Sequence, residues 1–166
     1  MQKNVLLFLL LNAVAIAKNV PPLTVTADEM TYNDKTKIST AVGNAIATFH
    51  NAEEGTQILT ADSMTAHHNA DDINGVDTLQ ATSTQHNHVL FQSPTLTVTA
   101  TTCRYDGKAQ NIICTGCVKV TDLKKKDTVT GDKAEINIQT KVYGVESFGE
   151  HISEAILHTG SAAPKT

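Results

Sequence analysis

The sequence Val-Thr-Ala-Asp-Glu-Met-Thr-Tyr-Asn-Asp, at residues 25–34, is followed by Gly43 eleven residues after its tyrosine. A close copy, Val-Thr-Ala-Thr-Thr-Cys-Arg-Tyr-Asp-Gly at residues 98–107, is followed by Gly116 at the same offset. Shorter copies start at residues 59 and 129, so the second positions, 26, 60, 99 and 130, are spaced by 34, 39 and 31 residues. A repeat of this period is typical of stacked arrays, in which no unit buries its apolar face alone. We therefore expect the function to lie in a surface that the repeats build together.

Each copy has the pattern of a bent β-strand. In residues 23–27 apolar side chains alternate with polar ones, as in a strand with one buried face. The apolar residues then change parity at Met30 and Tyr32, which predicts a β-bulge or kink near Asp28. A turn at residues 33–35 leads into a return strand, whose one face carries small residues and a phenylalanine: Ala41, Gly43, Ala45, Ala47 and Phe49.

The rest of the chain continues this pattern, and no helical periodicity is seen after residue 17. Strands of ordinary length would number about 14–16 in a chain of this size. Because they follow one another through hairpins, antiparallel pairing dominates. The sequence therefore predicts an all-β protein, an open, twisted antiparallel β-jelly roll built from successive β-hairpin repeats, with two sheets facing each other.

Composition limits the class of protein. The chain has 166 residues, enough for one domain, and a formal net charge of −4. No basic stripe is present that could neutralise phosphates, so nucleic acid is excluded as a partner. The one basic run, residues 124–126, is interpreted as a solvated loop.

The first residues have the pattern of an export signal. Lys3 precedes an apolar run at residues 5–17, and Ala15-Ile16-Ala17 fits the small-x-small site of a signal peptidase. The run is shorter than the roughly 20 residues that span a bilayer. We predict a cleaved signal peptide at residues 1–17, a β-jelly-roll domain at 18–158 and a flexible tail at 159–166, with the mature protein exported.

Catalytic and metal-binding patterns are not found. There is no Gly-x-Ser-x-Gly, His-Glu-x-x-His or Gly-rich phosphate loop, so we predict neither an enzyme nor a cofactor. The seven histidines have no spacing that fixes three or four converging zinc ligands, so no metal site is predicted. Cys103 and Cys114 lie on the two arms of a hairpin at Asp106-Gly107 and could form a disulfide, leaving Cys117 free. The sequence alone leaves the disulfide state open.

The repeats resemble the OstA-like family of lipopolysaccharide transport proteins, and most closely its small periplasmic bridge member. The resemblance covers roughly residues 23–148 and rests on five short motifs. These are Thr-Ala-Asp-x-Met-x-Tyr at 26–32, Ala-Val-Gly-Asn at 41–44, Leu-Thr-Ala-Asp at 59–62, Cys-Thr-Gly at 114–116 and Val-Thr-Gly-Asp-Lys at 129–133.

The resemblance implies a periplasmic location, a function and partners. A protein of this family would bind the acyl chains of lipopolysaccharide in an apolar groove between its sheets and bridge the inner and outer membranes. It would stack head to tail with copies of itself. It would also pair edge strands with LptC-like inner-membrane and LptD-like outer-membrane jelly-roll domains.

The residues expected to line this groove are apolar and lie on one strand face. For each of them, ordinary core packing is the competing interpretation. The predicted lipid-binding residues are Leu23, Val25, Leu90, Leu96, Val98, Tyr105, Val118, Val120 and Ile136.

Two other functions remain open at this point. The chain could be an LptC-like component anchored in the inner membrane, although its apolar N-terminal run is short for that role. It could also be a secreted β-repeat module with a structural or adhesive role that binds no lipid.

Overall fold

A computed structural model describes residues 23–51, 55–69, 75–84, 88–140 and 142–157. The predicted signal peptide, residues 1–17, and the predicted tail, residues 159–166, lie outside these ranges. Within them, no helix has the length and apolar character needed to cross a membrane.

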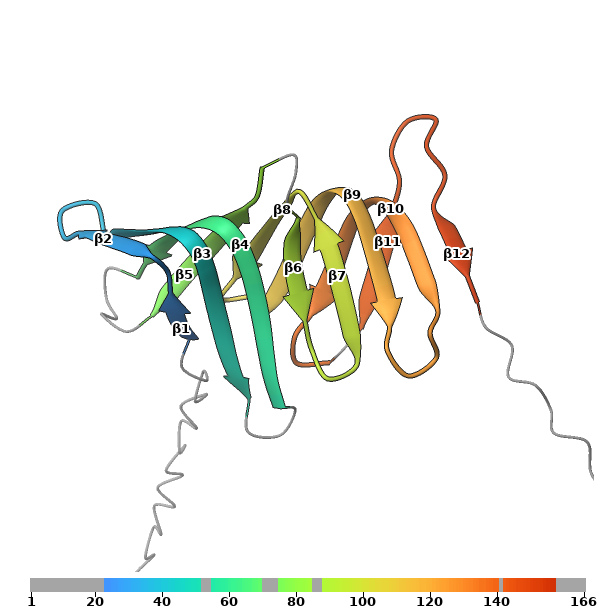
Figure 1. Ribbon diagram of the computed structural model, residues 1–166, viewed down its shortest axis with the longest axis horizontal. Coiled ribbons are helices and arrows are strands. Elements are labelled where there is room, and N and C mark those ends of the chain that lie inside the picture. The colour runs from blue at the N-terminus through green and yellow to red at the C-terminus, as the bar shows by residue number, and fades with distance from the viewer. Residues whose placement is uncertain (1–22, 52–54, 70–74, 85–87, 141, 158–166) are drawn as a thin grey trace, which may run out of the picture.

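The described residues form twelve β-strands, and every pair of neighbouring strands is antiparallel (Figure 1). The predicted fold class is confirmed. The strands are β1 (Leu23–Thr26), β2 (Glu29–Asn33), β3 (Ile38–Asn51), β4 (Gly55–His68), β5 (Val76–Thr82), β6 (Val89–Gln92), β7 (Leu96–Ala100), β8 (Thr102–Asp106), β9 (Asn111–Asp122), β10 (Thr128–Asn137), β11 (Tyr143–Glu146) and β12 (Glu154–Ile156).

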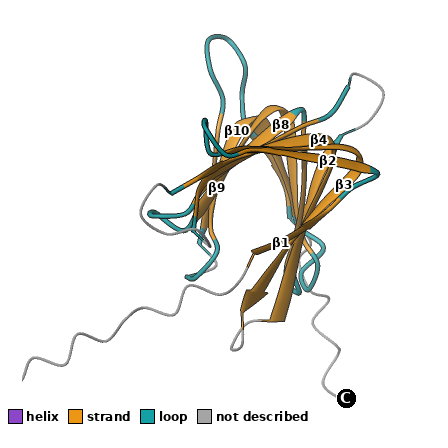
Figure 2. Cartoon of the chain, turned by 90° about the vertical axis from the view of Figure 1, so that its left-hand side faces the viewer, coloured by secondary structure: helices purple, strands orange, loops and turns teal. Residues whose placement is uncertain are grey.

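Four long strands, β3, β4, β9 and β10, connect two layers. In one layer, β3 pairs with β1, β4 with β6, β9 with β7 and β10 with β12. In the other layer, β3 pairs with β2, β4 with β5, β9 with β8 and β10 with β11. The first layer therefore runs β1-β3-β4-β6-β7-β9-β10-β12 and the second runs β2-β3-β4-β5-β8-β9-β10-β11. The predicted count of 14–16 strands was too high, because it divided strands that pass unbroken from one layer into the other. Seen from the end that carries β1 and β2, the strands form an arch (Figure 2).

The bend between the layers occurs where the repeat pattern predicts it. Asp28 separates β1 from β2, and its N–H donates to the carbonyl oxygen of Gly43 at 2.9 Å. Gly43 has a φ of 77°, and the register of β3 on β4 shifts between Val42 and Ala45. A side chain at Gly43 would strike that of Asp28, since an added Cβ would lie 2.5 Å from its carboxylate. Glycine is required here for both reasons.

The second copy repeats this bend. Thr101 separates β7 from β8, and its N–H donates to Gly116, at which φ is 83°. The hairpin that follows each bend is held by an Asx turn. The Asn33 side chain accepts from the N–H of Lys35 at 3.0 Å, and Asp106 accepts from the N–H of Lys108 at 2.9 Å.

Cys103 and Cys114 face each other across β8 and β9 and form a disulfide. Both are fully buried, whereas Cys117 is free and exposed. Of the arrangements that the sequence left open, the structure has the bridge across the hairpin.

The two ends of the array carry edge strands. Among the described residues, β1 and β2 pair only with β3, and β11 and β12 pair only with β10. These edges lie at opposite ends of the long axis (Figure 1). The fold is thus a sandwich that is open at both ends.

Candidate functional site

The inner faces of the two layers form one apolar cluster. Alanines fill much of it on β3 and β4, and larger side chains fill it from β5 to β10. The largest fully buried members are Phe91, Leu59, Met64, Leu79, Ile112, Val89, Val98, Val118 and Val120. The small residues predicted for the return strand do face inward, because Ala41, Ala45 and Ala47 are buried.

Six of the nine residues predicted to line a groove belong to this cluster and are buried: Leu96, Val98, Tyr105, Val118, Val120 and Ile136. Leu23 and Val25 are half-buried on β1 and pack against the edge of the cluster. Leu90 does not face inward. On β6 its neighbours Val89 and Phe91 are the buried residues, so Leu90 lies on the outer face. Strand parity could not be decided there because all three side chains are apolar.

A cavity of about 200 Å³ opens into the interior near the N-terminal edge. It lies beside the edge strand β1, which carries Leu23 and Val25. Both residues line it, together with Met30, Ser39, Thr40, Ala41, Met64, Ala66, His68, Val76 and Leu79. Most of the lining is apolar, and strands of both layers contribute to it. A cavity of this character suits an aliphatic chain better than a polar ligand.

One side of the cavity is polar, and no sequence motif predicted this. His68 Nε2 and Ser39 Oγ form a hydrogen bond of 2.6 Å between β4 and β3. The ring of Tyr32 meets the His68 ring edge to face, with centroids 5.5 Å apart. His68 belongs to a His-His pair at the end of the second copy, and only the register of β3 on β4 brings it next to Ser39.

Further along the interior, side chains of the two layers touch. The rings of Phe49, on β3, and Tyr105, on β8, meet edge to face with centroids 4.9 Å apart. Burial raises the pKa of the Tyr105 hydroxyl above its ordinary value. That hydroxyl accepts a hydrogen bond of 2.9 Å from Gln110 Nε2. The interior is therefore filled by its own side chains here and is open mainly at the N-terminal end.

The outer surface offers a polar concavity of about 430 Å³ over β9, β10 and β11. Its charged groups pair with one another. Lys133 Nζ lies 3.2 Å from a Glu146 carboxylate oxygen, and Asn111 Nδ2 donates to Glu135 at 2.7 Å. With its cation engaged in this way, the concavity is a poor site for an anionic ligand, and the apolar interior is the better candidate.

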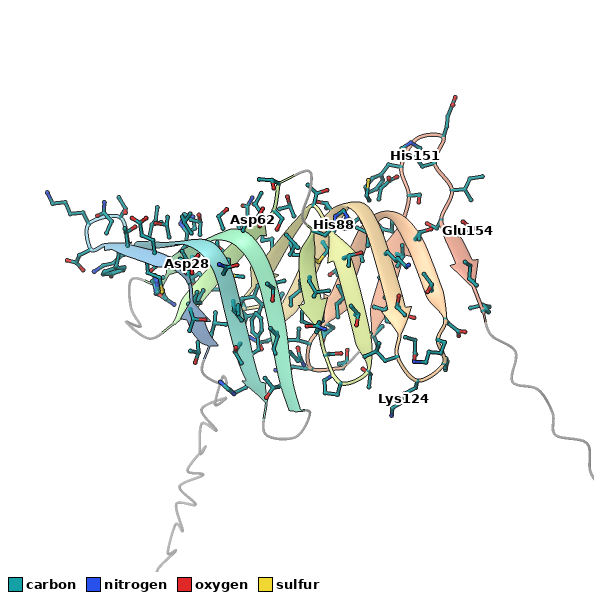
Figure 3. All side chains as sticks on the ribbon, in the orientation of Figure 1. Asp28, Asp62, His88, Lys124, His151 and Glu154 are labelled. Carbon is teal, nitrogen blue, oxygen red and sulfur yellow. A yellow bond between two sulfur atoms is a disulfide. The ribbon has the colours of Figure 1, made fainter. Side chains whose placement is uncertain are left out.

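Other polar residues lie on bends, turns and the outside of the arch. Figure 3 labels Asp28 and Asp62 along the bends of the long strands, and Lys124 on the turn between β9 and β10. The basic run is thus an exposed turn, as predicted. In the described ranges, no group of three or more histidine, cysteine, aspartate or glutamate residues could hold a metal ion.

Comparisons with known proteins agree with this geometry. Residues 24–142 match a family model described as LptA/(LptD N-terminal domain) LPS transport protein. Among solved structures, the chain is similar to LptH of Pseudomonas aeruginosa, with a TM-score of 0.68 and 13% identity. The similarity covers 84% of this chain and 96% of LptH, described as the LptA-homologous periplasmic component of that organism's lipopolysaccharide transport device. No match was found among curated proteins.

The structural similarity confirms the LptA-like jelly-roll fold, and the family match covers most of the domain predicted from the repeats. The family match also confirms the prediction of a non-enzymatic carrier. The chain therefore belongs to the LptA/LptD N-terminal domain family of lipopolysaccharide transport proteins.

Proposed function

We propose that this protein is the periplasmic bridge of a lipopolysaccharide transport system. It takes up acyl chains between its two layers and passes the lipid along a row of stacked copies between the inner and outer membranes. The observation that carries the proposal is the apolar cavity at the N-terminal edge, which continues into an apolar interior.

The proposed acyl-chain contacts are the inward-facing members of the predicted set. Leu23 and Val25 form the entrance, because they line the open cavity. Contacts deeper inside require the lipid to displace packed side chains. The deeper set is Leu96, Val98, Tyr105, Val118, Val120 and Ile136; Leu90 is left out because it faces outward.

Both ends carry apolar side chains beside strand edges that have no partner among the described residues. Met30 and Tyr32 are exposed on β2, and Ile156 is exposed on β12. Edge strands with apolar surroundings are suited to pairing with another strand. This supports head-to-tail stacking, and pairing of the terminal copies with LptC-like and LptD-like domains.

The junction between the two halves of the chain provides a template for such stacking. Here β5 pairs with β8 and β6 pairs with β7, all antiparallel. At the C-terminal end, β11 and β12 pair with β10 in the same way that β5 and β6 pair with β4, so β11 corresponds to β5 and β12 to β6. At the N-terminal end, β1 and β2 pair with β3 in the same way that β7 and β8 pair with β9, so β1 corresponds to β7 and β2 to β8. A second copy can therefore continue the array with the geometry that the chain already uses internally.

This template fixes a register. Ala81 lies opposite Cys103 at the internal junction. At the C-terminal end Val145 corresponds to Ala81, and at the N-terminal end Met30 corresponds to Cys103. Phe91 lies opposite Val98 at the same junction, where Ala155 corresponds to Phe91 and Val25 corresponds to Val98. We expect Val145 of one copy to lie opposite Met30 of the next.

The acyl-chain proposal is tested by photo-crosslinking. A crosslinking amino acid at Val25 is mixed with lipopolysaccharide, irradiated and examined on a gel. We expect an adduct at Val25 and none at Thr24, which lies on the outer face of the same strand. A folded protein that gives no adduct at Val25, Val98 or Val118 would favour a structural β-repeat module instead.

The stacking register is tested by cysteine crosslinking. With Cys117 replaced by serine, the variant M30C/V145C should form disulfide-linked oligomers on oxidation. The matched control M30C/G144C should form few, because a shift of one residue points the side chain to the other face. Oligomers of equal yield in both variants would contradict the register.

The periplasmic location rests on the N-terminal pattern and on the periplasmic origin given for LptH. We expect the protein recovered from the periplasm to begin at Lys18. Mass spectrometry of its N-terminus checks this. A recovered protein that still contains residues 1–17 would favour the membrane-anchored alternative.

A further inference from the structure

Gln57 is a polar residue at an inward-facing position of β4. It shares its strand face with Leu59 and Ala61 and lies opposite Phe49 of β3. Only 4% of its surface is exposed. The position therefore has the surroundings of a core residue and the chemistry of an amide.

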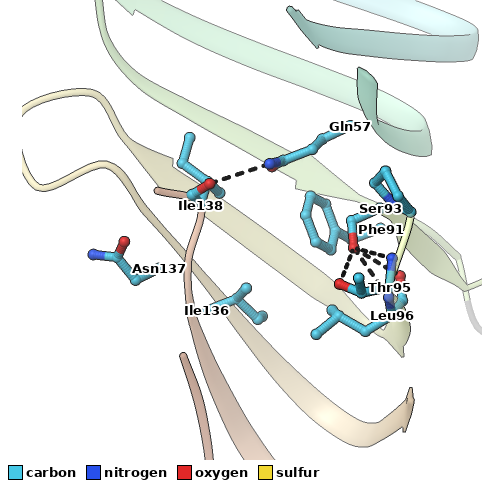
Figure 4. A pocket seen from close by; sticks show the side chains of 9 residues that line it. Gln57, Phe91, Ser93, Thr95, Leu96, Ile136, Asn137 and Ile138 are labelled. Carbon is cyan, nitrogen blue, oxygen red and sulfur yellow. Dashed lines mark hydrogen bonds between the residues drawn. The ribbon is translucent and has the colours of Figure 1, made fainter. Parts of the chain in front are cut away.

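The amide is only half satisfied. Gln57 Nε2 donates to the carbonyl oxygen of Ile138 at 3.1 Å, which ties β4 to the chain just after β10 (Figure 4). Gln57 Oε1 is buried and has no hydrogen-bond partner among the described residues. The bond to Ile138 holds the amide group in one orientation, so the acceptor is fixed in place without a donor.

Other buried polar groups in the described ranges do not share this combination. Ser83 Oγ accepts from the N–H of Asp62 at 3.2 Å, and Gln110 donates to Tyr105. Asn111 Oδ1 also lacks a partner, but it belongs to the polar concavity on the outer face. A leucine there would remove the acceptor that lacks a partner, but it would also remove the donor to the carbonyl oxygen of Ile138.

A small cavity of about 20 Å³ lies beside Gln57. That is space for one water molecule or one group of similar size. Leu96 and Ile136, two of the proposed acyl contacts, line the same cavity, together with Phe91 and Ile138. A lipid that contacts Leu96 and Ile136 therefore passes within reach of Gln57.

We propose that Gln57 Oε1 accepts a hydrogen bond from a hydroxyl group on an acyl chain bound in the interior. This inference rests on the proposed function and adds a polar specificity contact to it. A hydroxyl fits because it is a donor of about the size of water, and the residues that line the cavity include no carboxylate that could pair with a charged donor. Gln57 thus distinguishes a hydroxylated chain from a plain one.

The test compares tetradecanoic acid with 3-hydroxytetradecanoic acid, which differ by one hydroxyl. Affinities are measured by displacement of a fluorescent fatty acid from the purified protein. We expect the wild-type protein to bind the hydroxy acid about two- to tenfold more tightly, as one neutral hydrogen bond allows. Q57L should bind both acids equally, with an affinity for the plain acid like that of wild type.

The control is S93A. Ser93 lines the same cavity, but its hydroxyl already accepts from the N–H of Leu96 at 3.0 Å, so this variant should keep the preference. A wild-type protein without a preference, or a Q57L variant that retains it, would overturn the inference. If Q57L fails to fold, the wild-type ratio decides alone.

Equal binding of both acids together with a lipopolysaccharide adduct at Val25 would refute only the Gln57 contact. Failure of both acids to bind, with no adduct, would refute the transport groove as well.

Discussion

The two halves of the molecule, β1–β6 and β7–β12, are copies that differ in how well they are covered. From β1–β3 to β7–β9, positions 73 residues apart correspond, as Gly43 and Gly116 show at the two bends. Tyr32 is 55% exposed and its counterpart Tyr105 is 4% exposed. Met30 is 49% exposed, whereas its counterpart Cys103 is fully buried.

The difference comes from the neighbouring strands. β7 and β8 have partners on both sides, while β1 and β2 pair on one side only among the described strands. The same residue type at the same position of the repeat is therefore core in one copy and surface in the other. The N-terminal edge carries the side chains of an interior without the strands that would cover it. Such an edge is suited to a ligand or to a second copy.

Removing the two corresponding tyrosines should give very different losses of stability. Y105A should lower the free energy of unfolding by about 3–5 kcal/mol, the usual cost of removing a buried aromatic ring. Y32A should change it by less than about 1 kcal/mol, because its side chain already contacts solvent. Urea denaturation of the two variants measures both values. Similar losses would mean that Tyr32 is covered in solution, for example by a second copy, and dilution would then restore the difference.

The disulfide gives a second way to test the correspondence. Cys103 and Cys114 are eleven residues apart, and their counterparts Met30 and Ala41 lie opposite each other on β2 and β3. The variant M30C/A41C should form a disulfide that stabilises the N-terminal edge. The expected gain is about 2–3 kcal/mol, as loop closure of this length predicts.

Denaturation of this variant and of the wild type, both without a reducing agent, measures the gain, because the Cys103–Cys114 disulfide is then intact in both proteins. The matched control is T31C/A41C, in which the two side chains point to opposite faces of the sheet and no bond should form. Absence of the bond in M30C/A41C would show that the edge strand does not keep the register of its buried counterpart.

Local features of the fold could be predicted from the sequence because they depend on neighbouring residues. The change of parity near Asp28 predicted the bend, and the Asp106-Gly107 turn predicted the hairpin that places Cys103 opposite Cys114. Leu90 was predicted to face inward and does not, because an unbroken apolar run carries no parity. The expected strand count exceeded the twelve strands of the described residues because it assumed strands of ordinary length, whereas β3 and β4 have 14 residues each.

Features of the site that depend on pairing between distant strands were missed. Met64 and Leu79 reach the N-terminal cavity only through the pairing of β4 with β3 and β5. Gln57 belongs to none of the sequence motifs, and its hydrogen-bond partner, Ile138, lies 81 residues away. Contacts across such separations leave no periodic signal in a single sequence.

The smallest expected effect concerns pH and the two corresponding turns. Asp106 and Asn33 hold their turns in the same way, but only Asp106 can be charged. Hydrogen bonds from the N–H groups of Ala109 and Lys108 lower the pKa of Asp106 below its ordinary value of about 4. A carboxyl group with a lowered pKa stabilises the fold when it is ionised in both states. Its contribution is present above pH 5 and is lost as the pH falls through the lowered pKa.

The difference in unfolding free energy between wild type and D106N isolates this contribution, since all other carboxylates titrate in both proteins. We expect wild type to lose stability relative to D106N between pH 5 and pH 3. The effect should be small because Asp106 is exposed to solvent. The reverse variant, N33D, should gain a similar pH dependence in the first copy, because its side-chain oxygen accepts from the N–H groups of Lys35 and Thr36. If N33D shows none while D106N removes it, the two turns share their geometry but not their electrostatics. The positive charge of Arg104, whose counterpart in the first copy is Thr31, would then account for the difference.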